Sequence, residues 1–405
     1  MGLLLPLVLV LASLGGFAML GFVLLEAALA SFGVYLLVCL AVGLFHLVRR
    51  AGGKDSGIFR TPAVGWFAAA AAVAIVLGQF LLLGRELWAF GFFFFFAAAL
   101  PPLAALALAG GRLDPTTTWR RILAGVVTGS VVSIPLTILL GGAVSLLVFA
   151  LVVPLREVFA SAIGSRSLEQ LFFSPGLMIV LAEYAIVAPL VEEGTKPLAA
   201  IVLARRLRGP AEAFLVGMAG GVGFAILENM LYEASGGAGL WAGIATLRGV
   251  GGVLHPLNAG LVAVGWFGVR NGIPGAWGRL FGFYGLAVGV HALWNGALVV
   301  LLSGVGAYFF GAESWSIDVY GLGQPGVVIV FMLLEAAALW RLLPLVTERL
   351  RDPALGAEAP TIELAMAQPR RLALWAAGLM FVLVPLGALY GPLVARYAVR
   401  LTPLG

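Results

Sequence analysis

Residues 188–203 read APLVEEGTKPLAAIVL, which places two carboxylates and one ammonium inside an otherwise apolar stretch. A run of about 20 predominantly apolar residues is long enough to cross a bilayer as a helix. A charged side chain at the centre of the membrane costs about 2.5–3.5 kcal/mol even on a lenient insertion scale. We therefore expect this segment to be a membrane helix whose charges face other polar helices and serve a function.

The composition excludes a soluble protein. Of the 405 residues, 62% are hydrophobic and 11% are charged, whereas soluble domains carry about 25% charged residues. The net charge of +5 does not indicate nucleic-acid binding, because the basic residues lie in short loops between apolar runs. In such loops lysine and arginine report the orientation of a membrane protein. The lipid bilayer is therefore an expected partner, and nucleic acid is not.

The apolar runs predict an all-α, polytopic transmembrane helix bundle. At about 20 residues for each crossing we expect about 11 spans, within a range of about 9–12. They lie near residues 3–25, 28–48, 62–84, 87–110, 122–146, 177–203, 211–233, 241–268, 279–303, 326–346 and 372–395.

The basic loops decide the orientation of the bundle. If residues 122–155 cross the membrane once, nearly every basic loop falls on one side, and the positive-inside rule makes that side cytoplasmic. Two crossings there would move Arg205, Arg206 and Arg208 to the opposite side. We therefore expect a single crossing, with the N-terminus in the cytoplasm and the C-terminus outside.

Ionisable side chains within membrane spans are functional candidates by default, and here they gather between residues 183 and 295. Four successive spans contribute Glu192, Glu193 and Lys196; Phe224, Glu228 and Tyr232; Arg248, His255 and Asn258; and His291 with Asn295. At the helical rise, Glu192, His291 and His255 lie about 16, 18 and 20 Å from the cytoplasmic ends of their helices. Glu228 lies roughly 10 Å further out, level with Arg248, with which it could pair. These depths predict one common polar layer.

A structural role is the alternative for each of these residues. An isolated buried glutamate or histidine often makes only a structural hydrogen bond, and Glu–Lys at i, i+4 can be a neutralising pair. This alternative weighs as much as function for Lys196, Arg248 and Tyr232. It does not account for the joint set of three carboxylates and two mid-membrane histidines, for which we favour a site. Glu335, in a later span, has no partner that the sequence identifies.

Carboxylates and histidines at one depth suggest the activation of water. A glutamate held in a low dielectric would serve as general base, while His291 and Asn295 on one helix face would donate to the oxyanion. Alternatively a zinc ion is held by a mixed histidine and carboxylate shell, made of Glu192, Glu228, His255 and His291. The chain has no HExxH and no GxSxG motif, which argues against a standard zincin and a serine hydrolase. The cofactor stays open between none and zinc.

Four short motifs occur in order on these spans. EEGTK (192–196) matches EExxK, GFAILENMLY (223–232) matches FxxxExxxY, RGVGGVLHPLNAG (248–260) has the Arg-x6-His spacing, and HALWNG (291–296) matches HxxWN. In this order they resemble the PrsW family of bacterial membrane proteases, distant relatives of the CAAX prenyl endopeptidases and of the γ-secretase scaffold subunit. The resemblance covers roughly residues 177–305.

The resemblance implies an integral protein of the bacterial cytoplasmic membrane that cleaves membrane-anchored proteins, a membrane-bound anti-sigma factor being the best-known type of substrate. It implies Glu192 as base, with His291 and Asn295 as oxyanion donors. Glu193 would anchor the site through Lys196 or a neighbouring span. The related endopeptidases have histidine where this chain has Glu228, so the role of that residue and a metal mechanism stay open.

The expected spans, together with the extent of the resemblance, suggest how the chain is organised. Residues 1–155 would form an N-terminal transmembrane region of about five spans, residues 156–310 the PrsW-like catalytic core, and residues 311–405 a two-span region with a cytoplasmic linker. Two other functions remain, a non-catalytic scaffold or receptor of the same fold and a proton-coupled transporter that uses the carboxylates as a relay. A transporter usually brings paired half-repeats or broken helices. The sequence shows no such symmetry, although Pro189 and Pro256 could break helices beside the site.

Overall fold

The computed structural model is helical throughout the part of the chain that it describes. This part comprises scattered positions between 31 and 49, residue 52, and residues 57–84, 86–113, 117–147, 182–235, 237–309 and 324–351. Within these ranges there is no β-strand, and one isolated antiparallel bridge joins Ile58 to Thr118. The all-α prediction is confirmed for these residues.

Six helical segments of the described chain are long and apolar enough to cross a membrane: Val64–Leu83, Ala89–Leu113, Trp119–Leu147, Pro210–Ala234, Trp241–Arg270 and Val328–Arg351. Each coincides with an expected span, which makes the chain an integral membrane protein. The spans expected near 3–25 and 372–395, and part of the one near 28–48, lie outside the described residues. The total of about eleven spans and the orientation of the N-terminus therefore stay predictions.

The segment from residue 122 is one helix as far as Leu147, as the single-crossing interpretation expects. It begins as α5 (Trp119–Val127) and passes through a π-helical turn (Thr128–Ser133) before returning to α-helical geometry. Residues 148–155 lie outside the described part of the chain.

The described residues fall into two compact units. The first holds the described residues within 1–138, 191–291 and 332–359, and the second holds those within 139–190 and 292–331. The helices α9 (Ala188–Thr195), α14 (Ala276–Phe309) and α15 (Gln324–Arg351) pass from one unit to the other. Glu192, Glu228, His255 and His291 all lie in the first unit, whereas Asn295 lies in the second.

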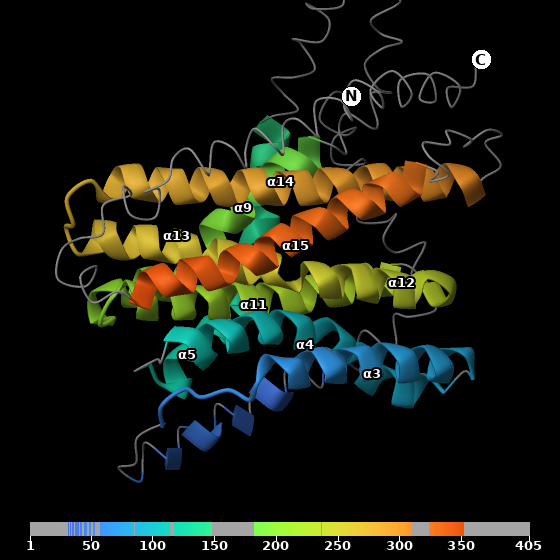
Figure 1. The fold of residues 1–405 in the computed structure, drawn as a ribbon, viewed down its shortest axis with the longest axis horizontal. Coiled ribbons are helices and arrows are strands. Elements are labelled where there is room, and N and C mark those ends of the chain that lie inside the picture. Colours follow the sequence, from blue (N-terminus) through green and yellow to red (C-terminus); the bar gives the residue numbers. More distant parts are fainter. Residues whose placement is uncertain are drawn as a thin grey trace, which may run out of the picture. The chain divides into compact units, whose positions relative to one another are not determined.

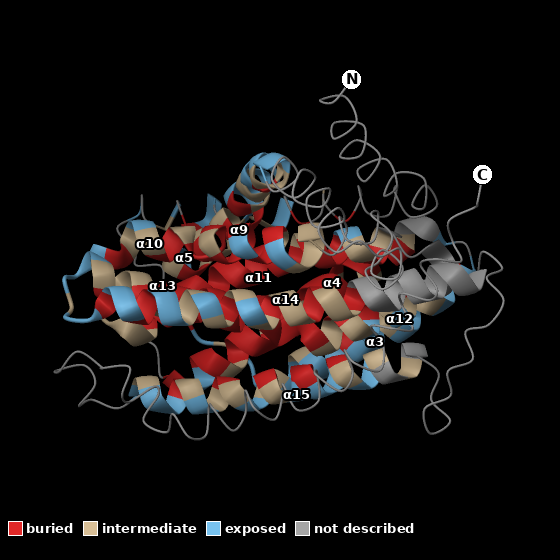
Figure 2. Ribbon diagram, turned by 90° about the horizontal axis from the view of Figure 1, so that it is seen from above, coloured by how far each residue is buried: buried red, intermediate tan, exposed pale blue. Residues whose placement is uncertain are grey.

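Helix α11 (Pro210–Ser235) is the centre of the first unit. It packs along α13 (Leu254–Arg270), α4 (Leu87–Leu113) and α5, and Figure 1 shows it between α13 and these two helices. In its membrane-spanning window 89% of the residues are buried, against 22% in α3 (Val64–Leu83). The buried residues concentrate along α11 in Figure 2. Helix α11 is therefore the core helix, whereas α3 has the exposed apolar surface of a helix that faces lipid.

Glycines let other backbones approach α11 closely. A Cβ atom at Gly220 would lie 2.2 Å from the carbonyl oxygen of Lys196, and one at Gly221 would lie 2.2 Å from that of His255. Small residues at helix contacts are the usual means of close packing within membranes, where no hydrophobic force drives helices together. Two charged or polar candidate residues are thus seated directly on the central helix.

The expected span 177–203 is broken beside its charges. Helix α9 ends at Thr195, and α10 (Leu198–Leu203) begins after Lys196 and Pro197. Proline has no N–H to continue the helical ladder. At the break the carbonyl of Thr195 accepts a 2.7 Å hydrogen bond from Ser133 Oγ. Interrupted helices are tolerated at membrane depth where protein surrounds them. The break places Lys196 at a turn inside the bundle.

A second interruption precedes His255. Helix α12 (Gly237–Val250) is followed by a 3₁₀ turn (Gly251–Val253) and then by α13. A Cβ atom at Gly252 would lie 2.8 Å from Pro101 Cβ, so the turn packs closely against α4. Just before the turn, the carbonyl of Val250 accepts a 2.9 Å hydrogen bond from the indole N–H of Trp340 on α15.

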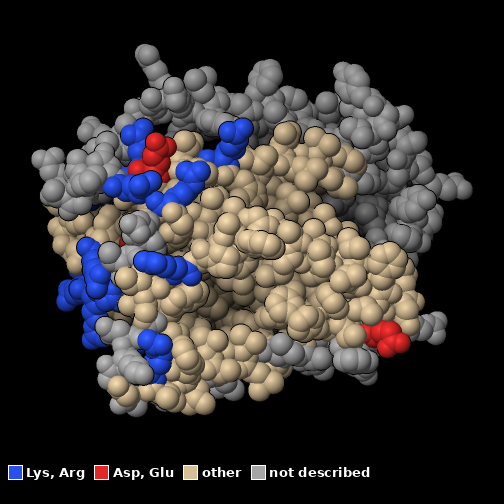
Figure 3. Space-filling view, turned by 60° about the horizontal axis from the view of Figure 1, so that its bottom comes forward, with Lys and Arg blue, Asp and Glu red and all other residues tan. Residues whose placement is uncertain are grey.

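Arginines gather at one end of the first unit, where Figure 3 shows Lys and Arg along one side of the face. They lie at the C-terminal ends of α4 and α13 and at the N-terminal end of α5. Arg121 contacts Glu212 at the start of α11 and donates to the carbonyl of Arg206, while Arg205 donates to that of Arg270. Basic residues from separate loops thus share one end of the unit, as a positive-inside arrangement requires.

Candidate functional site

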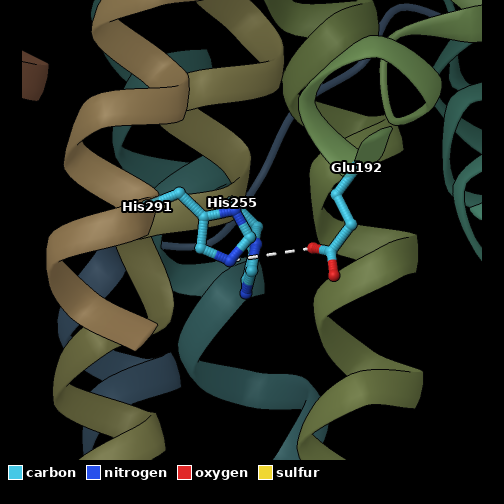
Figure 4. Close-up of side chains that lie close together, drawn as sticks. All are labelled: Glu192, His255 and His291. Atoms are coloured by element: carbon cyan, nitrogen blue, oxygen red, sulfur yellow. Dashed lines mark ion pairs between the residues drawn. The ribbon is translucent and has the colours of Figure 1, made fainter. Parts of the chain in front are cut away.

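Charged and polar side chains from five helices and one turn meet inside the first unit. These residues are Glu192 and Glu193 on α9, Lys196 in the turn, Glu228 on α11, Arg248 on α12, His255 on α13 and His291 on α14. All are buried. Figure 4 shows Glu192 on one side facing the rings of His255 and His291 on the other. Residues that are far apart in the sequence are therefore assembled into one cluster. It includes Glu228 and Arg248, which were expected roughly 10 Å further out than the other members.

The Lys196 ammonium lies among the carboxylates and histidines. Its Nζ is 2.8 Å from Glu193 Oε1 and 2.9 Å from Glu192 Oε2. It is also 2.8 Å from His255 Nδ1 and 3.4 Å from His291 Nδ1. The Phe224 ring covers it, with the ring centroid 4.5 Å from Nζ. One fully buried cation thus links residues from four helices, α9, α11, α13 and α14.

We assign the hydrogen of each imidazole from the shortest contact that each nitrogen makes. An ammonium only donates, so His255 Nδ1 accepts from Lys196 and the ring hydrogen is on Nε2. From there it is donated to Glu228 Oε2, 2.6 Å away. His291 Nδ1 lies 2.8 Å from Glu193 Oε1 and donates to it. The Nε2 atom of His291 is left with a lone pair.

That lone pair faces a carboxylate. His291 Nε2 lies 3.7 Å from Glu192 Oε2, and neither atom takes part in a hydrogen bond with the described residues, although Oε2 has its ion pair with Lys196. Two buried acceptors side by side are unfavourable unless a donor lies between them. A water molecule has two hydrogens and can donate to both. The pair is therefore suited to hold one water molecule beside a carboxylate base.

Arg248 holds the other side of the cluster. Its Nη2 lies 2.6 Å from Glu228 Oε2 and 3.3 Å from His255 Nε2, and its Nε donates a 2.8 Å hydrogen bond to Asn229 Oδ1. Asn229 in turn donates to the carbonyl of Ala98, and the guanidinium lies 4.6 Å from the centroid of the Tyr232 ring. The pairing of Glu228 with Arg248, expected from their depths, is present. Asn229 was missed by the sequence reasoning, although it adjoins Glu228 in an apolar span.

Asn258 and Asn295 make hydrogen bonds to backbone carbonyls. Asn258 Nδ2 donates to Ala287 and ties α13 to α14 within the first unit. Asn295 belongs to the second unit, where its Nδ2 donates a 3.0 Å hydrogen bond to the carbonyl of Tyr184. The donor role expected for Asn295 at an oxyanion stays a prediction. Glu335 is buried in α15, and both of its carboxylate oxygens lack a hydrogen bond to the described residues.

The match to known families covers this cluster. The family model described as PrsW family intramembrane metalloprotease matches residues 117–334. The chain belongs to the PrsW family. The resemblance inferred from the four motifs is thereby confirmed, and the match extends beyond them to include α5 and the first part of α15. Comparison with curated proteins and with solved structures gives no match. Membership of PrsW makes the chain a membrane-embedded protease by family.

The PrsW description implies a metal ion, and three residues of the cluster could approach one. Glu192, His255 and His291 each offer a ligand atom, and these atoms lie within 4.8 Å of one another. The carboxylate of Glu228, the fourth ligand expected from the sequence, is instead bound to Arg248 and His255. The set has the chemistry of a zinc shell.

As arranged, however, these residues do not fit a metal ion. Both nitrogens of His255 are engaged, Nδ1 with Lys196 and Nε2 with Glu228. A metal bonded to Glu192 Oε2 at about 2.0–2.2 Å would lie within about 5 Å of the ammonium, which is 2.9 Å from the same oxygen. Like charges at that separation repel strongly in a buried site. The cluster already contains its cation.

Proposed function

We propose that this PrsW protein is an intramembrane endopeptidase that hydrolyses peptide bonds of membrane-anchored proteins by glutamate-activated water. A membrane-bound anti-sigma factor is the substrate class suggested by the family resemblance, and the bacterial cytoplasmic membrane is the proposed location. The observation that carries the proposal is the pair of facing acceptors, Glu192 Oε2 and His291 Nε2, 3.7 Å apart.

Glu192 is assigned as the general base because its side chain is the less enclosed of the two adjacent carboxylates. Its side chain is 9% exposed, whereas that of Glu193 is 0% exposed. Glu193 already accepts from Lys196 and His291, so it positions the histidine. A water molecule held between Glu192 and His291 loses one proton to Glu192 Oε2 as its oxygen attacks the substrate carbonyl. The tetrahedral intermediate collapses when Glu192 returns that proton to the leaving amine.

The oxyanion of the intermediate needs N–H donors. The hydrogen of His291 is directed at Glu193, which favours a water-holding role for this ring. Arg248 Nη1 is buried and makes no hydrogen bond to the described residues, so we assign it as one donor. The second amide hydrogen of Asn295 is the donor suggested by the sequence.

Cleavage of tagged single-span membrane proteins by the purified chain tests this function. Glu192→Gln keeps the size of the side chain but removes the base, and we expect it to abolish cleavage without lowering the melting temperature. Glu86→Gln changes an exposed carboxylate at the start of α4 and is the matched control, expected to cleave like the parent. Cleavage by Glu192→Gln at the parent rate would contradict the assignment.

A further inference from the structure

The Lys196 ammonium lies where the ligand atoms of the cluster converge. Two of the three residues that could approach a metal, Glu192 and His255, direct an oxygen and a nitrogen at Nζ from 2.9 and 2.8 Å. Glu193 adds a second carboxylate at 2.8 Å. The lone pairs that a metal ion would use in this arrangement are thus directed at an organic cation.

The remaining surroundings of Nζ favour an ammonium over a metal. The face of the Phe224 ring lies on another side, with its centroid at 4.5 Å. An aromatic face attracts an ammonium electrostatically, whereas zinc is bound through nitrogen, oxygen or sulfur lone pairs. The side chain of Lys196 is 0% exposed.

The backbone fixes Lys196 in this place. The helix breaks immediately after it at Pro197, and its N–H still donates to the carbonyl of Glu192 at 2.9 Å. Its own carbonyl lies against Gly220, where a Cβ atom would be only 2.2 Å away. The backbone N–H and the backbone carbonyl of Lys196 are therefore both fixed, and its Cα has little freedom to move away from the cluster.

We propose that the Lys196 ammonium is the resident cation of the site and excludes a divalent metal ion from it. Lys196 is then a positioning residue: it fixes the hydrogen of His255 on Nε2 and holds both carboxylates of α9 in register. This role rests on the proposed assignment of the cluster as the hydrolytic site, but the exclusion of a metal does not depend on whether the protein cleaves a substrate.

The test is the zinc content of purified protein after incubation with excess zinc chloride and removal of free metal by desalting. We expect the parent to retain less than about one tenth of an equivalent, and Lys196→Ala, which opens the centre of the cluster, to retain about one zinc for each chain. The double variant Lys196→Ala/Glu192→Gln removes a ligand and is expected to return to the parent value.

Stoichiometric zinc in the parent would overturn the proposal, as would a folded Lys196→Ala that gains none. If Lys196→Ala does not fold, the parent decides: its melting temperature should be unchanged by zinc or by a strong chelator, because a ligand that binds only the folded state raises it. A shift with either reagent would overturn the proposal. No proteolysis is measured, so failure of the proposed function would not affect the result.

Discussion

The substitution Gly221→Ala should displace His255 without replacing any residue of the cluster, and so tests whether activity depends on the geometry of the site. The added Cβ would lie 2.2 Å from the carbonyl oxygen of His255, 2.6 Å from its carbonyl carbon and 2.8 Å from Pro256 Cα. These are backbone atoms and cannot turn aside as a flexible side chain can. Ordinary contact begins at 3.4 Å, so the start of α13 must move away from α11 by about 1.2 Å.

A displacement of this size breaks the contacts that hold His255. Its Nδ1 and Nε2 lie 2.8 and 2.6 Å from Lys196 and Glu228, and about 1 Å of added separation takes both beyond hydrogen-bonding distance. A misplacement of about 1 Å can reduce a catalytic rate about 100-fold, equivalent to about 2.7 kcal/mol in the barrier. Overpacking adds about 1–3 kcal/mol of destabilisation.

The assay is the rate of cleavage of a single-span reporter in detergent, measured beside the melting temperature. Gly243→Ala is the matched control, because a Cβ atom there meets nothing within 4 Å and alanine favours a helix by about 1 kcal/mol. We expect the control to cleave at the parent rate and to melt no lower. A Gly221→Ala protein that matched the parent in both measurements would refute the reasoning.

Three further outcomes follow from the contacts of the cluster. Arg248→Met leaves Glu228 buried without its ion pair and should lower the free energy of unfolding by about 3–5 kcal/mol; chemical denaturation should show partial recovery in Arg248→Met/Glu228→Gln. Glu193→Gln replaces the charged acceptor of the His291 ring hydrogen and should lower the cleavage rate at least about 10-fold. Glu86→Gln is the control; Glu212→Asp is not suitable, because Glu212 pairs with Arg121. Cleavage after exhaustive chelation should stay within about twofold of the untreated rate if no metal takes part, and loss of activity restored by zinc would contradict the glutamate mechanism.

Long apolar runs were sufficient to predict the helices. The expected spans near 62–84 and 211–233 agree with α3 and with the spanning part of α11 to within two residues at their ends. The breaks were not predicted, because hydropathy does not register them. Pro197 was a visible signal for the first break, whereas the 3₁₀ turn at Gly251–Val253 depends on packing against Pro101.

The common depth of the candidate residues was predictable, but the contacts between them were not. Counting the rise along each helix placed Glu228 roughly 10 Å beyond His255, yet their side chains lie 2.6 Å apart. Such counting follows backbones and ignores the reach of a glutamate and an imidazole along the helix axis. The pairing of Lys196 with Glu192 follows from i, i+4 spacing, while its contact with His255 depends on how separate helices pack.

The sequence separations within the cluster have a consequence for biogenesis. Lys196 contacts a histidine 59 residues later and another 95 residues later. At about 5–20 residues synthesised each second, the last of these partners follows Lys196 by about 5–20 s. During that interval Lys196 can pair only with Glu192 and Glu193 of its own segment. One ammonium and two carboxylates leave a net charge of −1 in the segment until the later partners have been made. This helix is therefore expected to stay beside the insertion machinery until α14 has been made, and to enter the bundle late.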